Sequence, residues 1–170
     1  WLDPPPEPAF QSARDLLARL GALDDLGRVT PQGKEMARLG LHPRLGHMLL
    51  EGRRMGRLAL ACDLAAILEE RDFLHFPPGA GDADIRLRVE ALREGRAFRA
   101  AEASVNPEAC RRIRAQAARW AEMLRGGNGK FDPDGMEDMD RDVGSLLALA
   151  YPDRVAQLRP EGERRYRLSG

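Results

Sequence analysis

The sequence predicts a mainly α-helical fold, on three observations. Apolar residues recur three and four positions apart through most of the chain, which is the spacing of helices packed on a core. Proline and glycine separate these periodic segments, as they do at helix ends. Alternating β-type patterns are confined to short stretches. A chain of 170 residues can bury a real core as one large domain or two small ones.

The first 45 residues carry the clearest helix signals. Pro8 opens a helix that Gly21 ends, with an apolar face formed by Phe10, Ala13, Leu16, Leu17 and Leu20. Residues 23–29 are typical of a tight turn between two very short strands. Thr30-Pro31 then predicts a capped helix start, Gly40 ends that short helix, and Pro43 opens another. Two short helices meeting at a sharp corner beside a small β wing predict a winged-helix module over residues 1–45.

Residues 46–150 are expected to form a helical bundle. The segment 57–70 is apolar on nearly every side, which is typical of a central, buried helix. A loop over 73–81 follows, and Asp82 or Asp84 is expected to cap the next helix. Residues 97–105 are interpreted as helix fading into a connection. A strong helix from Asn106-Pro107 to Arg125 and a last one ending near Ala150 carry inward residues at helical spacing: Ile113, Ala117, Trp120 and Leu124 in the first, Val143, Leu146 and Leu147 in the second.

Residues 151–170 predict a short β-hairpin, with strands over 155–159 and 164–168. An isolated hairpin is only marginally stable, so we expect it to be the truncated start of a β domain. The chain also opens on Trp1 without a methionine, and we expect it to be a piece of a longer protein.

The charge is balanced overall, with 27 basic and 27 acidic residues, but it is unevenly distributed. Residues 86–125 hold ten arginines and five glutamates, a net charge of +5, whereas residues 132–142 carry a net charge of −5. The candidate nucleic-acid-binding residues are Arg111, Arg112, Arg114 and Arg119, because guanidinium groups form paired hydrogen bonds with phosphate oxygens. The competing interpretation is an ordinary solvated helix face, partly balanced by Glu108 and Glu122.

No catalytic or metal site is expected. The glycines before Lys130 follow a helix, not a strand, and Phe131 stands where a phosphate loop has Ser or Thr. The aspartates between 132 and 142 lack the glycine position of a calcium loop. His42, His47 and His75 have no partners at ligand or triad spacing. Cys62 and Cys110 are too few for a disulfide scaffold and predict buried thiols of a cytoplasmic protein, and no segment predicts a membrane span.

Several stretches together resemble one family. These are WLDPPP, LLARLGALDDLGRVTPQGKEMARLGLHPRLGHMLL, LAAILEERDFL, LLALAYPDRVAQ and RYRLSG. They are similar to the C-terminal half of DEAH-box helicases, and the third and last two favour the bacterial HrpB type.

The resemblance implies a part of an ATP-dependent motor. Upstream ATPase domains of the same chain would hydrolyse ATP with Mg²⁺, and residues 1–170 include no phosphate loop or DEAH box, so the fragment alone should be inactive. The winged helix would join a ratchet-like, helicase-associated bundle to those domains, and the bundle would contact single-stranded RNA. The hairpin would begin an OB-like domain.

Two other functions stay open at this stage. One is a free-standing winged-helix DNA-binding regulator with a helical dimerisation domain, for which Gln32, Lys34, Glu35 and Arg38 would offer base-reading side chains. The other is a purely structural helical adaptor.

Overall fold

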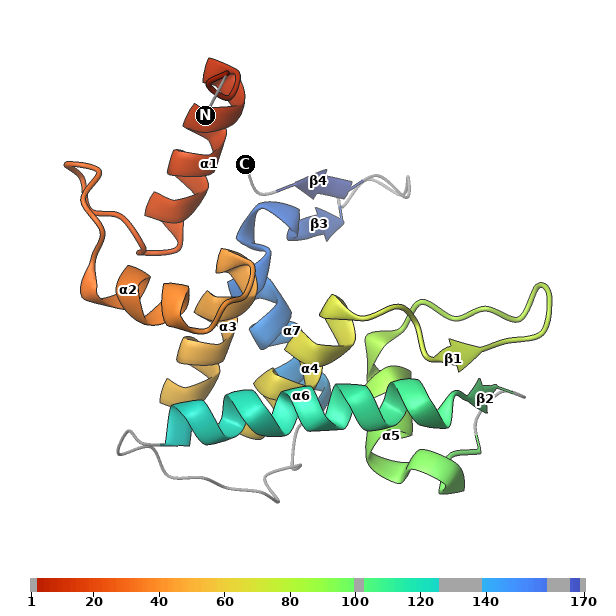
Figure 1. Cartoon of the computed structure of the whole chain (residues 1–170). Helices are drawn as coiled ribbons and strands as arrows, with labels where there is room; N and C mark the ends of the chain where they lie inside the picture. The colour runs from red at the N-terminus through yellow and green to blue at the C-terminus, as the bar shows by residue number, and fades with distance from the viewer. Residues whose placement is uncertain (1–2, 100–102, 126–138, 159–165, 169–170) are drawn as a thin grey trace. The chain divides into compact units, whose positions relative to one another are not determined.

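The computed structural model describes residues 3–99, 103–125, 139–158 and 166–168. Within these ranges the chain forms seven α-helices, two single-turn 3₁₀ helices and four short strands (Figure 1). The mainly α fold class is therefore confirmed. Two compact units, residues 1–47 and 48–170, divide within helix α3 (Pro43–Arg54) and are described separately below.

The first unit is built on the predicted corner between two short helices. Thr30 caps α2 (Pro31–Arg38): its Oγ1 accepts a hydrogen bond from the Gly33 N–H at 3.0 Å and donates one to the Gly21 carbonyl at 2.6 Å. Gly40 follows with a φ of +65°, a conformation that glycine adopts without strain, and α3 then begins at Pro43. His42 acts as a cap, since its Nδ1 accepts from the Arg44 N–H at 3.3 Å.

The predicted wing is reduced to one antiparallel bridge between Leu23 and Val29. Asp24 orders the turn inside it by accepting the backbone N–H groups of Leu26 and Arg28. These hydrogen bonds, with that from the Arg28 side chain, hold the pKa of Asp24 below its ordinary value.

The helix predicted to open at Pro8 leaves most of its apolar face exposed. Helix α1 (Glu7–Arg19) forms, but none of its residues is buried and Phe10 is 45% exposed. Only the end of its apolar stripe is covered, with Leu16 and Leu17 half-buried and Leu20 buried just past the helix. Periodicity identified the helix but could not show how much of its stripe has a neighbour.

The second unit is organised around α4 (Leu58–Glu69), the helix that is apolar on nearly every side. It contacts α5 (Ile85–Glu94), α6 (Pro107–Arg125) and α7 (Met139–Ala150). It also approaches α3 closely, because a Cβ added to Gly52 would lie 2.5 Å from the Ala61 Cβ. Its buried side chains are Leu58, Leu60, Ala61, Cys62, Leu64, Ala65, Ala66 and Ile67. The predicted central helix is confirmed.

Ion pairs hold the outer helices in place. Arg57, just before α4, pairs with Asp142 of α7, which is buried. Arg86 of α5 pairs with Asp140 at 2.9 Å. Two of the acidic residues considered for a metal loop thus serve as arginine partners, while Asp132, Asp134, Asp138 and the Gly126–Lys130 run lie outside the described residues.

A small two-stranded sheet was missed by sequence reasoning. β1 (Leu74–His75) and β2 (Ser104–Val105) pair antiparallel, and the Asn106 N–H extends the ladder to the Phe73 carbonyl at 2.9 Å. The predicted loop over 73–81 and the fading helix over 97–105 are therefore corrected at these residues. Two-residue strands are too short to show an alternating pattern, so the pairing follows from tertiary structure.

The C-terminal hairpin is confirmed in its described part. After α7 and the 3₁₀ turn Pro152–Arg154, β3 (Ala156–Leu158) pairs antiparallel with β4 (Tyr166–Leu168). Residues 160–163, the predicted turn, lie outside the described residues.

Asp84, one of the two predicted caps, is the N-cap of α5, and its Oδ1 accepts the Arg86 N–H at 2.9 Å. The Arg86 side chain and N–H hold the pKa of Asp84 below its ordinary value of 3.8. A lowered carboxyl pKa stabilises the fold above the unfolded value, and that contribution is lost as the pH falls through the folded value.

We therefore expect Asp84→Ala to lower the free energy of unfolding by about 1 kcal/mol at neutral pH. The difference from the unsubstituted chain should shrink in acid, as measured by urea unfolding across a pH series. Asp84→Asn is the matched control, because asparagine keeps the capping oxygen but does not titrate there. An alanine penalty that persists undiminished in strong acid would contradict the role of this charge.

Candidate nucleic-acid interface

The long helix α6 (Pro107–Arg125) carries all four candidate arginines. Asn106 caps it as predicted, its Oδ1 accepting the backbone N–H groups of Glu108 and Ala109, each at 3.1 Å. One face is buried, including Ile113, Ala117, Trp120 and Leu124. Trp120 is only 4% exposed, so it belongs to the core and does not offer a surface for base stacking.

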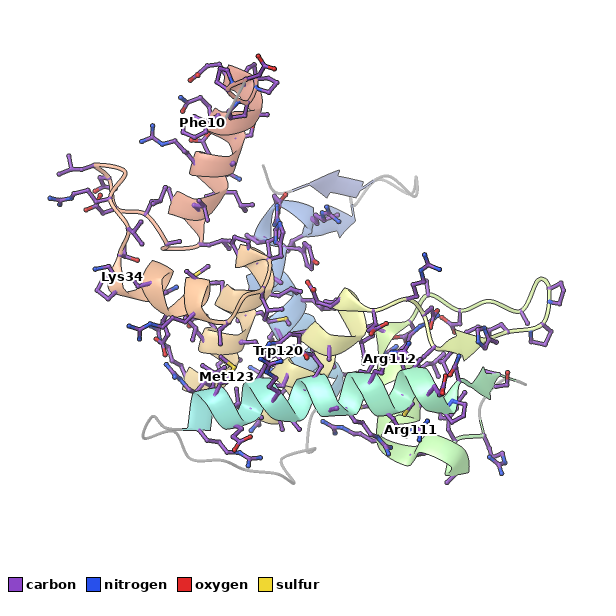
Figure 2. All side chains as sticks on the ribbon, viewed as in Figure 1. Phe10, Lys34, Arg111, Arg112, Trp120 and Met123 are labelled. Carbon is purple, nitrogen blue, oxygen red and sulfur yellow. The ribbon has the colours of Figure 1, made fainter. Side chains whose placement is uncertain are left out.

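The helix places the arginines on two sides. Arg112 and Arg119 are seven residues apart, so they lie on nearly the same face about 10 Å from each other. Arg111 and Arg114, three residues apart, share the other side. Figure 2 shows Arg111 and Arg112 leaving α6 in different directions. The sequence placed the four residues on one helix but did not separate these two surfaces.

The first surface is open to solvent. The Arg112 side chain is 59% exposed, with its Nε 3.5 Å from Glu70 Oε1. Arg119 is also exposed and has no ion-pair partner within the ranges that the structure describes. Exposed ion pairs contribute little to stability, so Arg112 can exchange its carboxylate for another anion at low cost.

Arg111 is the most exposed of the ion-paired candidates. Its side chain is 77% exposed and its Nη2 lies 3.8 Å from Glu108 Oε1, in an i, i+3 pair on the surface. The length of this contact and the exposure of both groups make it weak.

Arg114 has a structural task that the sequence did not reveal. Its Nε donates to the Leu92 carbonyl at 2.6 Å, and its Nη2 donates to the Arg93 carbonyl at 2.9 Å. These are among the last carbonyls of α5, where a cation is favoured by the helix dipole. Arg114 therefore ties α6 to the end of α5, and its guanidinium is fixed in place. Its contact with nucleic acid stays a prediction.

Behind α6, charged groups are paired and thiols are covered. Burial raises the pKa of Asp63, an effect that Arg93, 3.3 Å away, opposes. Burial also raises the pKa of the Cys62 thiol to about 12, so this sulfur is not a nucleophile at neutral pH. Cys110 is buried too. These groups serve packing, as the sequence indicated for the thiols.

The histidines and acids form no metal-binding arrangement in the described part of the chain, where no three His, Cys, Asp or Glu side chains gather. His47 shares a hydrogen bond with Gln32, and that Gln32 also donates to the Leu20 carbonyl. Gln32, a base-reading candidate for the regulator hypothesis, is therefore engaged within its own unit. Over the same described residues, no helix is both long and apolar enough to cross a bilayer.

Comparison with known proteins places these elements in a family. Residues 13–41 match the winged-helix part of the helicase associated domain (HA2). Two solved structures from Escherichia coli are similar along 99% of the chain: the DEAH/RHA helicase HrpB, at 32% identity and a TM-score of 0.65, and the DExH-box NTPase HrpB, at 33% identity and a TM-score of 0.63. The chain spans 17% of the length of each. No curated protein sequence matches it.

The winged-helix match covers the predicted corner, and the two structural matches extend through the bundle and the hairpin. The chain therefore belongs to the HrpB-type DEAH/RHA helicases and forms part of their C-terminal region.

Proposed function

We propose that this chain is the nucleic-acid-guiding accessory region of an ATP-dependent RNA helicase, and that it contacts single-stranded RNA through α6. The observation that carries the proposal is the exposure of Arg111, Arg112 and Arg119 on one long helix of a helicase accessory region. Arginines at fixed positions on a rigid helix supply phosphate contacts that do not depend on base sequence.

In this proposal other domains of the same polypeptide hydrolyse ATP with Mg²⁺. Residues 1–170 contain neither a phosphate loop nor a DEAH box. Among the described acids, Asp63, Asp140 and Asp142 are held in ion pairs with arginines. The task of this chain would be to hold the strand while the ATPase domains move, with α6 as the ratchet helix and the hairpin as the start of an OB-like, strand-binding domain.

The salt dependence of binding tests the proposal. We expect the chain to bind a labelled single-stranded oligouridylate weakly in fluorescence anisotropy, with log Kd rising steeply with log salt concentration, by about 0.7 for each phosphate contacted. It should show no preference among duplex DNA sequences.

A triple variant tests whether the exposed arginines of α6 make the contact. Replacing Arg111, Arg112 and Arg119 together with glutamine should weaken binding about tenfold or more, because each phosphate contact is lost along with its released counterion. The matched control is Arg54→Gln, an exposed arginine of α3. Tight, sequence-selective binding to duplex DNA, or equal losses in the triple variant and the control, would falsify the proposal.

A further inference from the structure

A hollow of about 750 Å³ lies beside the N-terminal end of α6. Three arginines, Arg99, Arg111 and Arg114, contribute to its wall. The other lining residues are small or apolar, apart from the hydroxyl of Ser104: Gly95, Phe98, Ala103, Val105, Pro107 and Cys110. No described lining residue is acidic, although Arg111 pairs with Glu108 outside the lining, so the described wall of the hollow is basic.

The arginines differ in how they are held. Arg114 is fixed by the carbonyls of Leu92 and Arg93, which occupy Nε and Nη2 and leave its Nη1 without a hydrogen-bond partner among the described residues. This position requires Gly95, because a Cβ there would lie 3.1 Å from Arg114 Nη2 and the residue has a φ of +60°. Arg99 donates from Nη1 to the Phe98 carbonyl at 2.9 Å. Arg111 also lines the hollow, and its Nη2 lies 3.8 Å from Glu108 Oε1 in a weak surface ion pair.

We propose that this hollow holds one backbone phosphate of a single strand, with its ribose and base against the apolar wall. A fixed guanidinium costs little ordering entropy when it binds, and nearby cations complete the charge-assisted hydrogen bonds. The volume suits a unit of nucleotide size. Arg112 and Arg119 lie on the open face of α6. They attract the strand by their positive charge but do not enclose any of its phosphates. This inference rests on the proposed binding of single-stranded RNA, and it makes the hollow the principal point of contact with that strand.

Two double variants of equal charge change test it on the 170-residue chain. In the hollow pair, Arg99→Gln is combined with Arg111→Gln; in the face pair, Arg112→Gln is combined with Arg119→Gln. The hollow pair should weaken oligouridylate binding about tenfold and lower the salt slope by about 0.7, whereas the face pair should cost less than about threefold. Arg114 is left intact because it joins α5 to α6, and circular dichroism melts check that both variants fold.

A competition experiment shows whether the hollow binds the phosphate of a nucleic-acid strand or free phosphate. Inorganic phosphate and uridine monophosphate, each compared with chloride at equal ionic strength, should not displace the oligouridylate at millimolar concentrations. Displacement that depends on Arg99 and Arg111 would make this a site for free phosphate and overturn the assignment to a strand. Equal losses in the two pairs, in a chain that binds RNA, would overturn the hollow alone; absence of RNA binding in the unsubstituted chain would instead contradict the proposed function.

Discussion

Replacing Gly33 with alanine should destabilise the first unit by about 3 kcal/mol. A Cβ at this position would lie 2.3 Å from the Ala22 carbonyl oxygen, which also accepts the Thr30 N–H at 3.0 Å. The Ala22 carbonyl is part of the backbone and cannot move aside as the end of a long side chain can. The overlap can therefore be relieved only by breaking the contact between α2 and the segment before it. The gain in helix propensity from alanine, about 1 kcal/mol, is too small to offset this overlap.

Hydrogen exchange of the α2 amides measures this effect locally. Gly46→Ala is the matched control, since its added Cβ would meet the Met36 Cβ at 3.4 Å, an ordinary contact. Protection of α2 should fall sharply in the first variant and change little in the second. Similar protection in both would show that the close approach at Gly33 can relax.

Replacing Phe73 with alanine should cost about 3–5 kcal/mol, because this side chain is only 1% exposed and its removal leaves a cavity. The Phe73 carbonyl also accepts the Asn106 N–H, so a disturbance here reaches the start of α6. Urea unfolding followed by the fluorescence of the buried Trp120 would report the loss.

Phe76→Ala supplies the comparison for Phe73. Phe76 is half-buried, and the Arg88 guanidinium lies 5.4 Å from its ring centre, so its removal should cost about 1 kcal/mol. Equal costs for the two variants would mean that the region around β1 is not part of the cooperative core.

Much of the fold could be predicted from the sequence because its signals are local. Proline and threonine set the start of α2, Asn106 caps α6, and the predominantly apolar sequence of α4 requires cover on most of its surface. The β1–β2 pair could not be predicted, since two-residue strands are formed by partners thirty residues away. The exposure of α1 could not be predicted either, because an apolar stripe in a sequence does not show which element packs against it.

The candidate site was predictable only in outline. Charge and helical spacing brought Arg111, Arg112, Arg114 and Arg119 to one helix. The carbonyls that hold Arg114 belong to α5, some twenty residues earlier, and nothing in the local pattern pointed to them. Arg99 stood out only as one of ten arginines in a basic stretch, yet tertiary structure places it on the wall of the same hollow as Arg111.

The predominantly apolar surface of α4 limits how this region can be shortened for experiments. A fragment ending at Arg125 would lack α7 and strip the cover from the part of α4 that contacts it. We expect such a truncation to aggregate on expression even though it retains helices α1 to α6. Boundaries for crystallisation or NMR therefore belong beyond Ala150, where the last covering helix is complete.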